Sequence, residues 1–166
     1  RGMAKTHNAL LLTEVAANGA LQTSLGSAPV IAGGELEPLV YNDALNAYLD
    51  DTASVAWVMR PSVYGEILVL DNANARRYAA NAQGDASNPM LLGYPVQYSA
   101  KAGATAASAK SVYFGNWSFV GYREAPGFTV LRDPYSLAKK GQIVLHYYFR
   151  TVYGVLQSEA IGYGAH

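Results

Sequence analysis

Three histidines are the residues of this sequence best suited to proton transfer or metal binding, and they lie far apart. His7, His146 and His166 show no metal-ligand spacing such as His-x-x-x-His, and the chain contains no cysteine. His146 stands within the strand-like run Ile143 to Arg150, which favours an ordinary strand position over a catalytic one. A hydrolase would need this imidazole within hydrogen-bond reach of a carboxylate in a cleft. An uncharacterised hydrolase is therefore the least favoured hypothesis.

Other motifs that could support catalysis have an ordinary structural explanation. Asp50 and Asp51 are adjacent carboxylates, but neighbouring residues at a helix end do not face each other, which favours a helix terminus. The segment Gly162-Tyr163-Gly164 is followed by no helical pattern and is therefore not predicted to be a phosphate loop. No Gly-x-Ser-x-Gly elbow is present. The residues thus predict no catalytic site, no cofactor, no metal site and no enzyme.

Composition narrows the classes of partner. Acidic and basic residues balance at 12 each, and charged residues are 14% of the 166, against about 25% in a typical soluble domain. We therefore expect no sequence-specific nucleic-acid partner, because the basic footprint is missing. We expect no membrane partner, because no apolar run approaches the roughly 20 residues that span a bilayer. We also expect no export signal, and the lack of cysteine fits a reducing compartment.

Tyrosine supplies most of the aromatic residues, with 13 Tyr against 4 Phe and 2 Trp. A tyrosine offers apolar area and one polar group, which suits surfaces that are alternately wet and buried. Few charges and many tyrosines favour a surface that neighbouring subunits cover. A tyrosine-rich core within a monomer is the alternative.

The clearest structural pattern is a long antiparallel hairpin. Apolar and polar residues alternate from Trp117 to Arg123, as in a half-buried strand. A turn at residues 125–127 (Ala-Pro-Gly) then predicts a reversal, and Phe128 to Asp133 predicts the return strand. Asp133-Pro134-Tyr135 is an ordinary end to a strand. Three arginines could line one region of this sheet, either as a solvated face with local ion pairs or as contacts to carboxylates of an adjacent subunit: Arg123, Arg132 and Arg150.

The remaining patterns mix helices and strands, which predicts an α+β fold. The apolar period predicts helices over Glu37 to Asp50 and from Pro61 or Ser62 to Leu70. Short apolar runs predict a strand over Ser54 to Met59 and a separate strand that ends near Tyr98. They also predict a strand over Ile143 to Arg150 and, after a turn at residues 153–154, one over Val155 to Ile161. Residues 16–34, 71–88, 100–110 and 136–142 are expected to be largely connecting segments.

Four segments in this order resemble a known family. They are Ala-Ser-Val-Ala-Trp-Val-Met (residues 53–59) between two helices, Leu-Leu-Gly-Tyr-Pro-Val (91–96), Phe-Gly-Asn-Trp (114–117) leading into the hairpin and Asp-Pro-Tyr (133–135), and a strand ending in Arg150 followed by Gly154 and Glu159-Ala160. Together they resemble the C-terminal portion of a tailed-bacteriophage major capsid protein with the Hong Kong 97-like fold. The resemblance covers about residues 36 to 162.

The resemblance implies a structural subunit of a bacteriophage or prophage icosahedral capsid, present in the virion and, during assembly, in the bacterial cytoplasm. Its partners would be copies of itself, as hexamers and pentamers of the full-length protein, with other capsid or scaffold proteins possible. It implies a connector with a residual peripheral segment (1–35), an axial-type domain (36–110), a peripheral-type domain with the long hairpin (111–150) and a C-terminal segment returning to the core (151–166). The family's N-terminal arm, long loop and spine helix are expected to be missing. The candidate subunit-interface residues are Arg123, Arg132, Asp133, Tyr135, Lys139 and Lys140.

Two other hypotheses remain open. An encapsulin-type compartment shell would share the same fold. A carbohydrate- or surface-binding β-rich module would use Trp57, Trp117 and exposed tyrosines as stacking platforms, and burial of both tryptophans would count against it.

Overall fold

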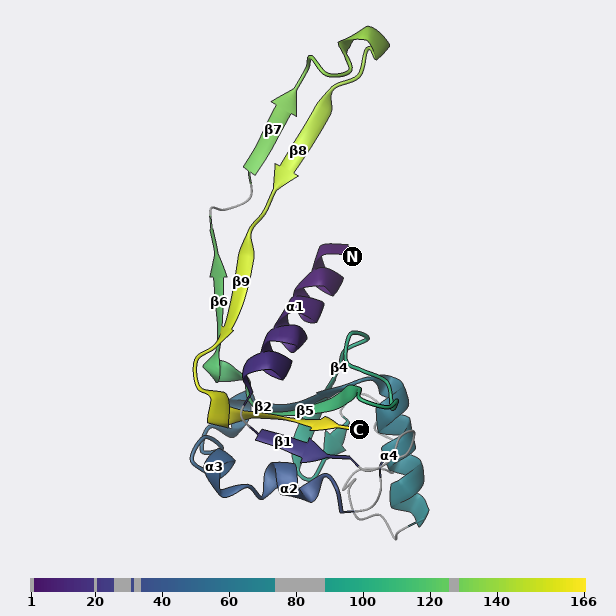
Figure 1. Ribbon diagram of the computed structural model, residues 1–166, viewed down its shortest axis with the longest axis vertical. Coiled ribbons are helices and arrows are strands. Elements are labelled where there is room, and N and C mark those ends of the chain that lie inside the picture. The colour runs from purple at the N-terminus through teal and green to yellow at the C-terminus, as the bar shows by residue number, and fades with distance from the viewer. Residues whose placement is uncertain (1, 20, 26–30, 32–33, 74–88, 126–128) are drawn as a thin grey trace.

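A six-stranded mixed sheet forms the body of the molecule, and a long two-stranded arm rises from one end of it (Figure 1). The computed structural model describes residues 2–19, 21–25, 31, 34–73, 89–125 and 129–166. Strand order in the sheet is β1-β10-β5-β2-β4-β3, in which β1 pairs with β10 and β2 pairs with β4 in parallel, and the other pairs are antiparallel. The strands are β1 (Leu21–Ser24), β10 (Ile161–Ala165), β5 (Lys110–Asn116), β2 (Val55–Met59), β4 (Tyr94–Tyr98) and β3 (Met90–Leu91).

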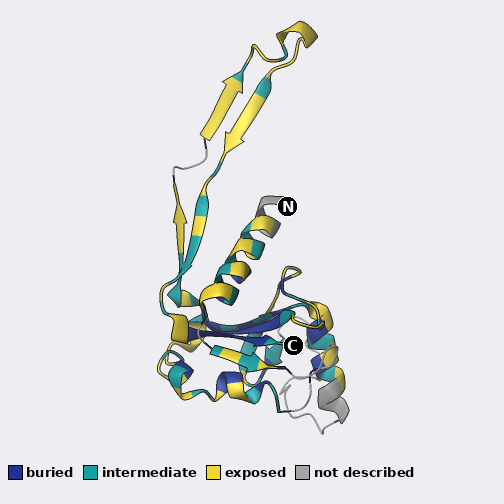
Figure 2. Cartoon of the chain, in the orientation of Figure 1, coloured by how far each residue is buried: buried dark blue, intermediate teal, exposed yellow. Residues whose placement is uncertain are grey.

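The sheet has an apolar cluster on each face, which explains why its central strand β5 is almost wholly buried (Figure 2). Phe114 of β5 packs with Trp57 on one face, their ring centroids 4.3 Å apart. Tyr113 belongs to the other cluster, with Leu12 and Val15 of the first helix. Alternate residues of a strand point to opposite faces, so one buried strand joins both halves of the core.

Helices cover the two faces of this sheet (Figure 1). Helix α1 (Gly2–Asn18) lies on the face from which the arm rises, whereas α2 (Glu37–Val40) and α3 (Asp43–Asn46) lie on the opposite side. Helix α4 (Pro61–Ala73) begins with proline, whose fixed φ suits a first helical turn, and it buries Val63 and Ile67. Within the described residues, no helix is long and apolar enough to cross a lipid bilayer.

The arm is built from two consecutive strand pairs. Strand β6 (Val120–Glu124) pairs with β9 (Thr151–Val155), and β7 (Thr129–Asp133) pairs with β8 (Val144–Tyr148). Strands β6 and β7 therefore run outward in succession, and β8 and β9 return. The chain reverses at residues 134–143, which contain a short 3-10 helix (Ala138–Lys140) that ends at Gly141 with φ +64°.

The prediction that Trp117–Arg123 pairs with Phe128–Asp133 is therefore wrong. A period of two identifies a strand but not its partner. Each of these strands instead pairs with a segment 11 to 35 residues further along the chain. The predicted turn at 125–127 falls mostly outside the described residues. The turn expected at Tyr153-Gly154 is also wrong, because both residues lie within β9; the chain instead bends at a 3-10 helix, Ser158–Ala160, before β10.

Two further predictions need correction. The helix expected over Glu37 to Asp50 is split into α2 and α3, because Asn42 is extended and its side chain accepts a hydrogen bond from the backbone N–H of Ala44, which caps a new helix. A long helix before residue 36 was not expected, yet α1 spans 17 residues and β1 follows it. The strands β2 and β4 and the helix α4 are confirmed; residues 74–88 of the predicted polar segment lie outside the described residues.

Candidate interaction surface on the arm

Polar side chains fix the root of the arm to the body. Asn116 is buried at the end of β5, and its Nδ2 donates to the backbone oxygen of Tyr48 at 2.8 Å, while its Oδ1 accepts from the N–H of Ser118 at 3.0 Å. The side-chain amide of Gln157 donates to the hydroxyl of Tyr48 at 2.8 Å, and the Tyr48 ring meets Phe119 edge-on. The outgoing and returning strands are thus both attached to the same tyrosine next to α3.

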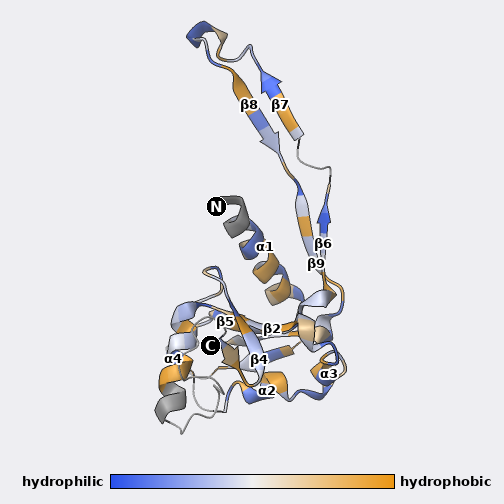
Figure 3. Ribbon diagram, turned by 180° about the vertical axis from the view of Figure 1, so that it is seen from behind, coloured by the Kyte–Doolittle hydropathy of each residue, from blue (hydrophilic) through white to orange (hydrophobic). Residues whose placement is uncertain are grey.

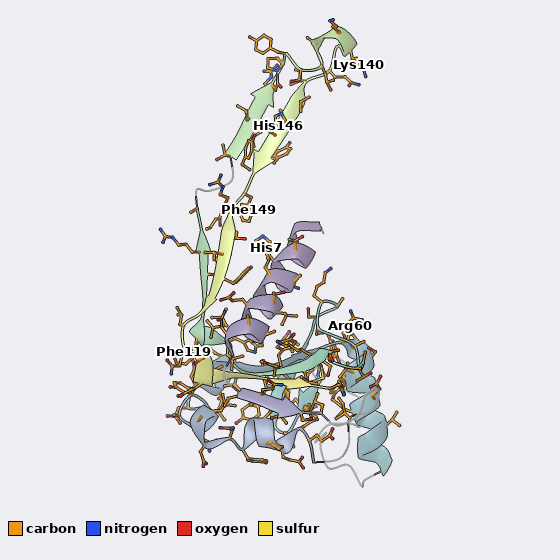
Figure 4. The ribbon with its side chains drawn as sticks, in the orientation of Figure 1. His7, Arg60, Phe119, Lys140, His146 and Phe149 are labelled. Atoms are coloured by element: carbon orange, nitrogen blue, oxygen red, sulfur yellow. The ribbon has the colours of Figure 1, made fainter. Side chains whose placement is uncertain are left out.

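Helix α1 supports the inner half of the arm through one histidine. His7 Nδ1 and the hydroxyl of Tyr153 lie 2.9 Å apart, within hydrogen-bond distance. The imidazole also contacts three rings, with centroid distances of 5.4 Å to Phe149, 6.0 Å to Tyr153 and 6.4 Å to Tyr122 (Figure 4). These contacts orient the inner arm against α1, so His7 has a structural role here.

In the outer half of the arm, among the described residues, only Tyr147 at the inner end of β8 lines the groove with α1. Beyond α1, the pair β7–β8 extends alone from the body (Figures 1 and 2), and apolar stretches recur along both strands (Figure 3). Directly opposite residues share a face, so Val130 and Tyr147 lie on one face and Leu131 and His146 on the other. The exposed apolar and aromatic side chains of this region are Val130, Leu131, Ile143, Leu145, Tyr147 and Tyr148.

The tip is a hydrogen-bonded turn that carries charge. The Asp133 carboxylate accepts hydrogen bonds from the Ser136 hydroxyl and from the backbone N–H groups of Tyr135 and Ser136. The Ser136 hydroxyl, those two N–H groups and the nearby His146 lower the pKa of Asp133, because each favours the carboxylate. Tyr135, next to this turn, is 86% exposed.

The six candidate interface residues all lie on the arm, in two groups. Asp133, Tyr135, Lys139 and Lys140 are gathered at the tip, with Arg132 at the end of β7 beside them, whereas Arg123 lies on β6 in the inner half. Arg150, which was considered with the arginines, instead lines a groove of about 600 Å³ between α1 and the arm together with Thr6, His7, Leu10, Tyr147, Phe149 and Thr151. The three arginines therefore do not form one patch.

Sequence reasoning missed the apolar part of this surface and the support from His7. The alternation of valine, leucine and tyrosine over residues 143–153 was a visible signal, but it predicts a half-buried strand equally well. His7 gave no signal, because its partners lie more than 110 residues away in the sequence.

The described residues contain no group of three or more His, Asp or Glu side chains placed to hold a metal ion. His146 lies on the exposed arm, stacked near Tyr148, rather than in a cleft. Trp57 is fully buried and cannot act as a stacking platform, and Trp117 is half-buried with its indole N–H donated to the oxygen of Ala56. These positions weaken the hydrolase and carbohydrate-binding hypotheses.

Comparison with known proteins identifies the family. The family model described as "Phage capsid family" matches residues 12–165, so the chain belongs to the phage capsid family. This confirms the resemblance drawn from the four sequence segments, and the predicted α+β capsid fold. No curated protein sequence matches the chain.

Solved structures show the same fold. A chain from a structure described as "Capsid of native GTA particle computed with C5 symmetry" is 27% identical with a TM-score of 0.68, and the match covers 87% of this chain and 53% of that one. A chain from "Capsid of empty GTA particle computed with C5 symmetry" is 26% identical with a TM-score of 0.64, covering 87% and 49%. A chain of Gordonia phage Cozz, 15% identical with a TM-score of 0.57 over 91% and 50%, shares the fold. The chain thus spans about half the length of these relatives.

Proposed function

We propose that this chain forms part of the major structural subunit of a bacteriophage or prophage capsid, with a structural rather than a catalytic role. Copies of the subunit would contact one another through different surface patches, and such heterologous contacts generate rings and closed shells. Membership of the phage capsid family supports this function. So does the similarity to chains from capsids of GTA particles at 26% and 27% identity.

The observation that carries the proposal is the unsupported outer arm. A two-stranded ribbon is marginally stable alone in water, yet β7–β8 exposes apolar side chains on both faces, Val130 at 49% and Leu131 at 53% exposure. Contiguous exposed apolar surface marks an interaction site. A neighbouring subunit in the shell would bury this surface and stabilise the ribbon.

The candidate interface residues fit this role. The tip presents Lys139 and Lys140 in the last turn of a 3-10 helix, beside the exposed ring of Tyr135 and the ordered Asp133 turn. Each such contact is weak by itself, and many contacts per subunit hold a shell together by multivalency. We assign these residues, with Arg123 and Arg132, to contacts between subunits.

The division into an axial-type and a peripheral-type part remains part of the proposal, with boundaries that follow the elements. The six-stranded sheet with α2, α3 and α4 would be the axial-type body, so β5 belongs to it. The arm from Val120 to Val155 would be the peripheral-type part, together with α1, which packs against β9. The full-length protein would form hexamers and pentamers, assemble in the bacterial cytoplasm and end in the virion; scaffold or other capsid proteins are further partners in this proposal.

Light scattering behind a sizing column tests the function. The samples are this chain, the complete product of its gene, and that product with Lys139→Glu and Lys140→Glu. We expect rings or shells from the unaltered product and smaller species from the double variant, because the reversed charge opposes its partner surface. A complete product that stays monomeric at high concentration would contradict the capsid function. Electron microscopy of any particles separates a capsid from a compartment shell by its contents, nucleic acid or a cargo enzyme.

A further inference from the structure

The inner half of the arm has a shallow hollow on the face that α1 does not cover. Tyr122 and Tyr153 point toward His7 of α1, and strand residues alternate in facing, so the next pair, Gly121 and Gly154, faces the opposite way. The two glycines lie directly across from each other in β6 and β9. They form the floor of a hollow of about 240 Å³.

The walls of this hollow are apolar, with one cation beside them. Val152 is 60% exposed and Leu156 is 71% exposed, and both line the hollow together with Arg123. An apolar hollow of this size accepts one large side chain, and a guanidinium next to it suits a carboxylate on the same ligand.

The chain itself does not require a glycine at position 154. A Cβ built there meets no atom within 4 Å, and the backbone is not in the positive-φ region that favours glycine. Glycine weakens the interior of a strand. Where a strand nevertheless contains one, a common reason is that another backbone or a ligand approaches closely there. The open space above Gly154 therefore fits a surface that something else occupies.

Charge complementarity indicates the occupant. Residues 120–155 contain five Lys or Arg against two acidic residues, whereas residues 31–59 contain five acidic residues and no Lys or Arg. The acidic segment includes α2 and α3, on the opposite side of the sheet from α1 (Figure 1). Within one molecule the acidic segment reaches, among the described residues, only the root of the arm, where Tyr48 packs against Phe119. Between two molecules the opposite charges of the two segments attract each other.

One side chain of the acidic segment matches the hollow. Tyr41, between α2 and α3, is 71% exposed, and the exposed carboxylate of Asp43 follows two residues later. The intervening Asn42 is extended, with φ −87° and ψ 127°. Gly121 and Arg123 are also two residues apart on an extended strand, a separation of about 6.6 Å at 3.3 Å per residue. A ring in the hollow would therefore place a carboxylate beside the guanidinium.

We propose that this hollow receives Tyr41 of a second copy of the chain, with Arg123 paired to Asp43 of that copy. The inference rests on the proposed shell function and names one of its contacts. The two patches differ, so the contact is heterologous and each copy offers one hollow and one tyrosine to its neighbours.

Glycine substitutions test the hollow without disturbing the fold. In the complete gene product, Gly154→Ala and Gly154→Val fill the floor, and valine also favours the strand, so folding is retained. We expect Gly154→Val to raise the concentration at which half the protein is assembled by about tenfold or more, with a smaller rise for alanine. Gly65→Ala is the matched control, because a Cβ at Gly65 in α4 also meets nothing within 4 Å. It should assemble as the unaltered protein does.

Charge reversal tests the occupant. Arg123→Asp and Asp43→Arg should each weaken assembly, and the double variant should restore it, because the pair is re-formed with opposite polarity. A photoreactive residue at position 152 should cross-link to a peptide containing Tyr41. Circular dichroism melting curves establish that each variant is folded.

The outcomes separate the two proposals. If the unaltered gene product does not assemble, the shell function fails, and this contact fails with it. If it assembles and Gly154→Val assembles equally well, or the cross-link joins position 152 to another segment, the shell function stands and the assignment of this hollow is overturned. Failure of the double reversal to recover assembly rejects Asp43 as the partner of Arg123.

Discussion

Trp57→Phe is the substitution that best tests the account of the core. Trp57 is fully buried, packs against Phe114, and donates its indole N–H to the backbone oxygen of Leu91 at 2.9 Å. Phenylalanine retains one aromatic ring but has no donor. The oxygen of Leu91 would then lose this hydrogen bond in a place that water does not reach, because Leu91 is also fully buried.

Two terms give the expected loss of stability. A buried acceptor that loses its partner costs about 1–3 kcal/mol. The smaller side chain leaves a void of roughly 40 Å³, which costs about 1 kcal/mol at ~24 cal/mol per Å³. We therefore expect Trp57→Phe to lower the free energy of unfolding by about 2–4 kcal/mol.

Trp117→Phe is the matched control. Trp117 also donates its indole N–H to a backbone oxygen at 2.9 Å, that of Ala56, but its side chain is half-buried and water can replace the lost donor. We expect a loss of about 1 kcal/mol. Urea unfolding followed by far-ultraviolet circular dichroism measures both variants, since tryptophan fluorescence would itself change. Equal losses in the two variants, within about 0.5 kcal/mol, would refute the argument that burial decides the cost of the missing hydrogen bond.

Three further predictions concern other parts of the chain. Gly115→Ala should lower the free energy of unfolding by about 3 kcal/mol or more, because its Cβ would overlap the backbone oxygen of Ala160; an unchanged urea midpoint would contradict this close approach. Asn42→Ala should cost about 1 kcal/mol by removing the cap of α3, measured in the same way, and Asn42→Ser should recover most of it. Ser136→Ala should raise the lowered pKa of Asp133, measured by nuclear magnetic resonance titration of its carboxyl. Because the pKa of Asp133 is lower in the folded than in the unfolded chain, its carboxylate stabilises the tip at pH values above the unfolded pKa. This stabilisation is lost as the pH falls through the folded pKa. An unchanged titration curve in the variant would exclude the serine as the cause of the lowered pKa.

Local patterns were sufficient where an element's own sequence decides its conformation. The β2 strand was predicted from a short apolar run, and in the structure Val55, Trp57 and Met59 are buried while the residues between them are half-buried. Helix α4 begins at Pro61 as its sequence predicts. These elements also carry much of the resemblance that the family match confirms.

Local patterns failed to predict an element where a packing partner or a single capping residue decides its conformation. Helix α1 was not predicted, because Leu12 and Val15 become its buried residues only through packing on the sheet, and its sequence has no marked apolar face otherwise. One hydrogen bond, from Ala44 to Asn42, divides the expected helix over Glu37 to Asp50.

The same contrast holds for the interaction surface. Charged candidates at the tip could be named from the sequence, since Asp133, Lys139 and Lys140 stand in a turn-forming segment. The hollow at Gly154 could not, because it exists only where β9 pairs with β6. A glycine read in sequence indicates a turn, whereas in the paired strands it leaves open space.

The sequence by itself thus determined the family, the α+β class and the strands and helices whose periodicity is internal. Only the tertiary structure decided which strands pair, and hence that one arm runs out along β6 and β7 and returns along β8 and β9. The physical reason is that side-chain alternation records which face of a strand is buried, whereas the backbone hydrogen bonds that select its partner are the same for every residue type except proline.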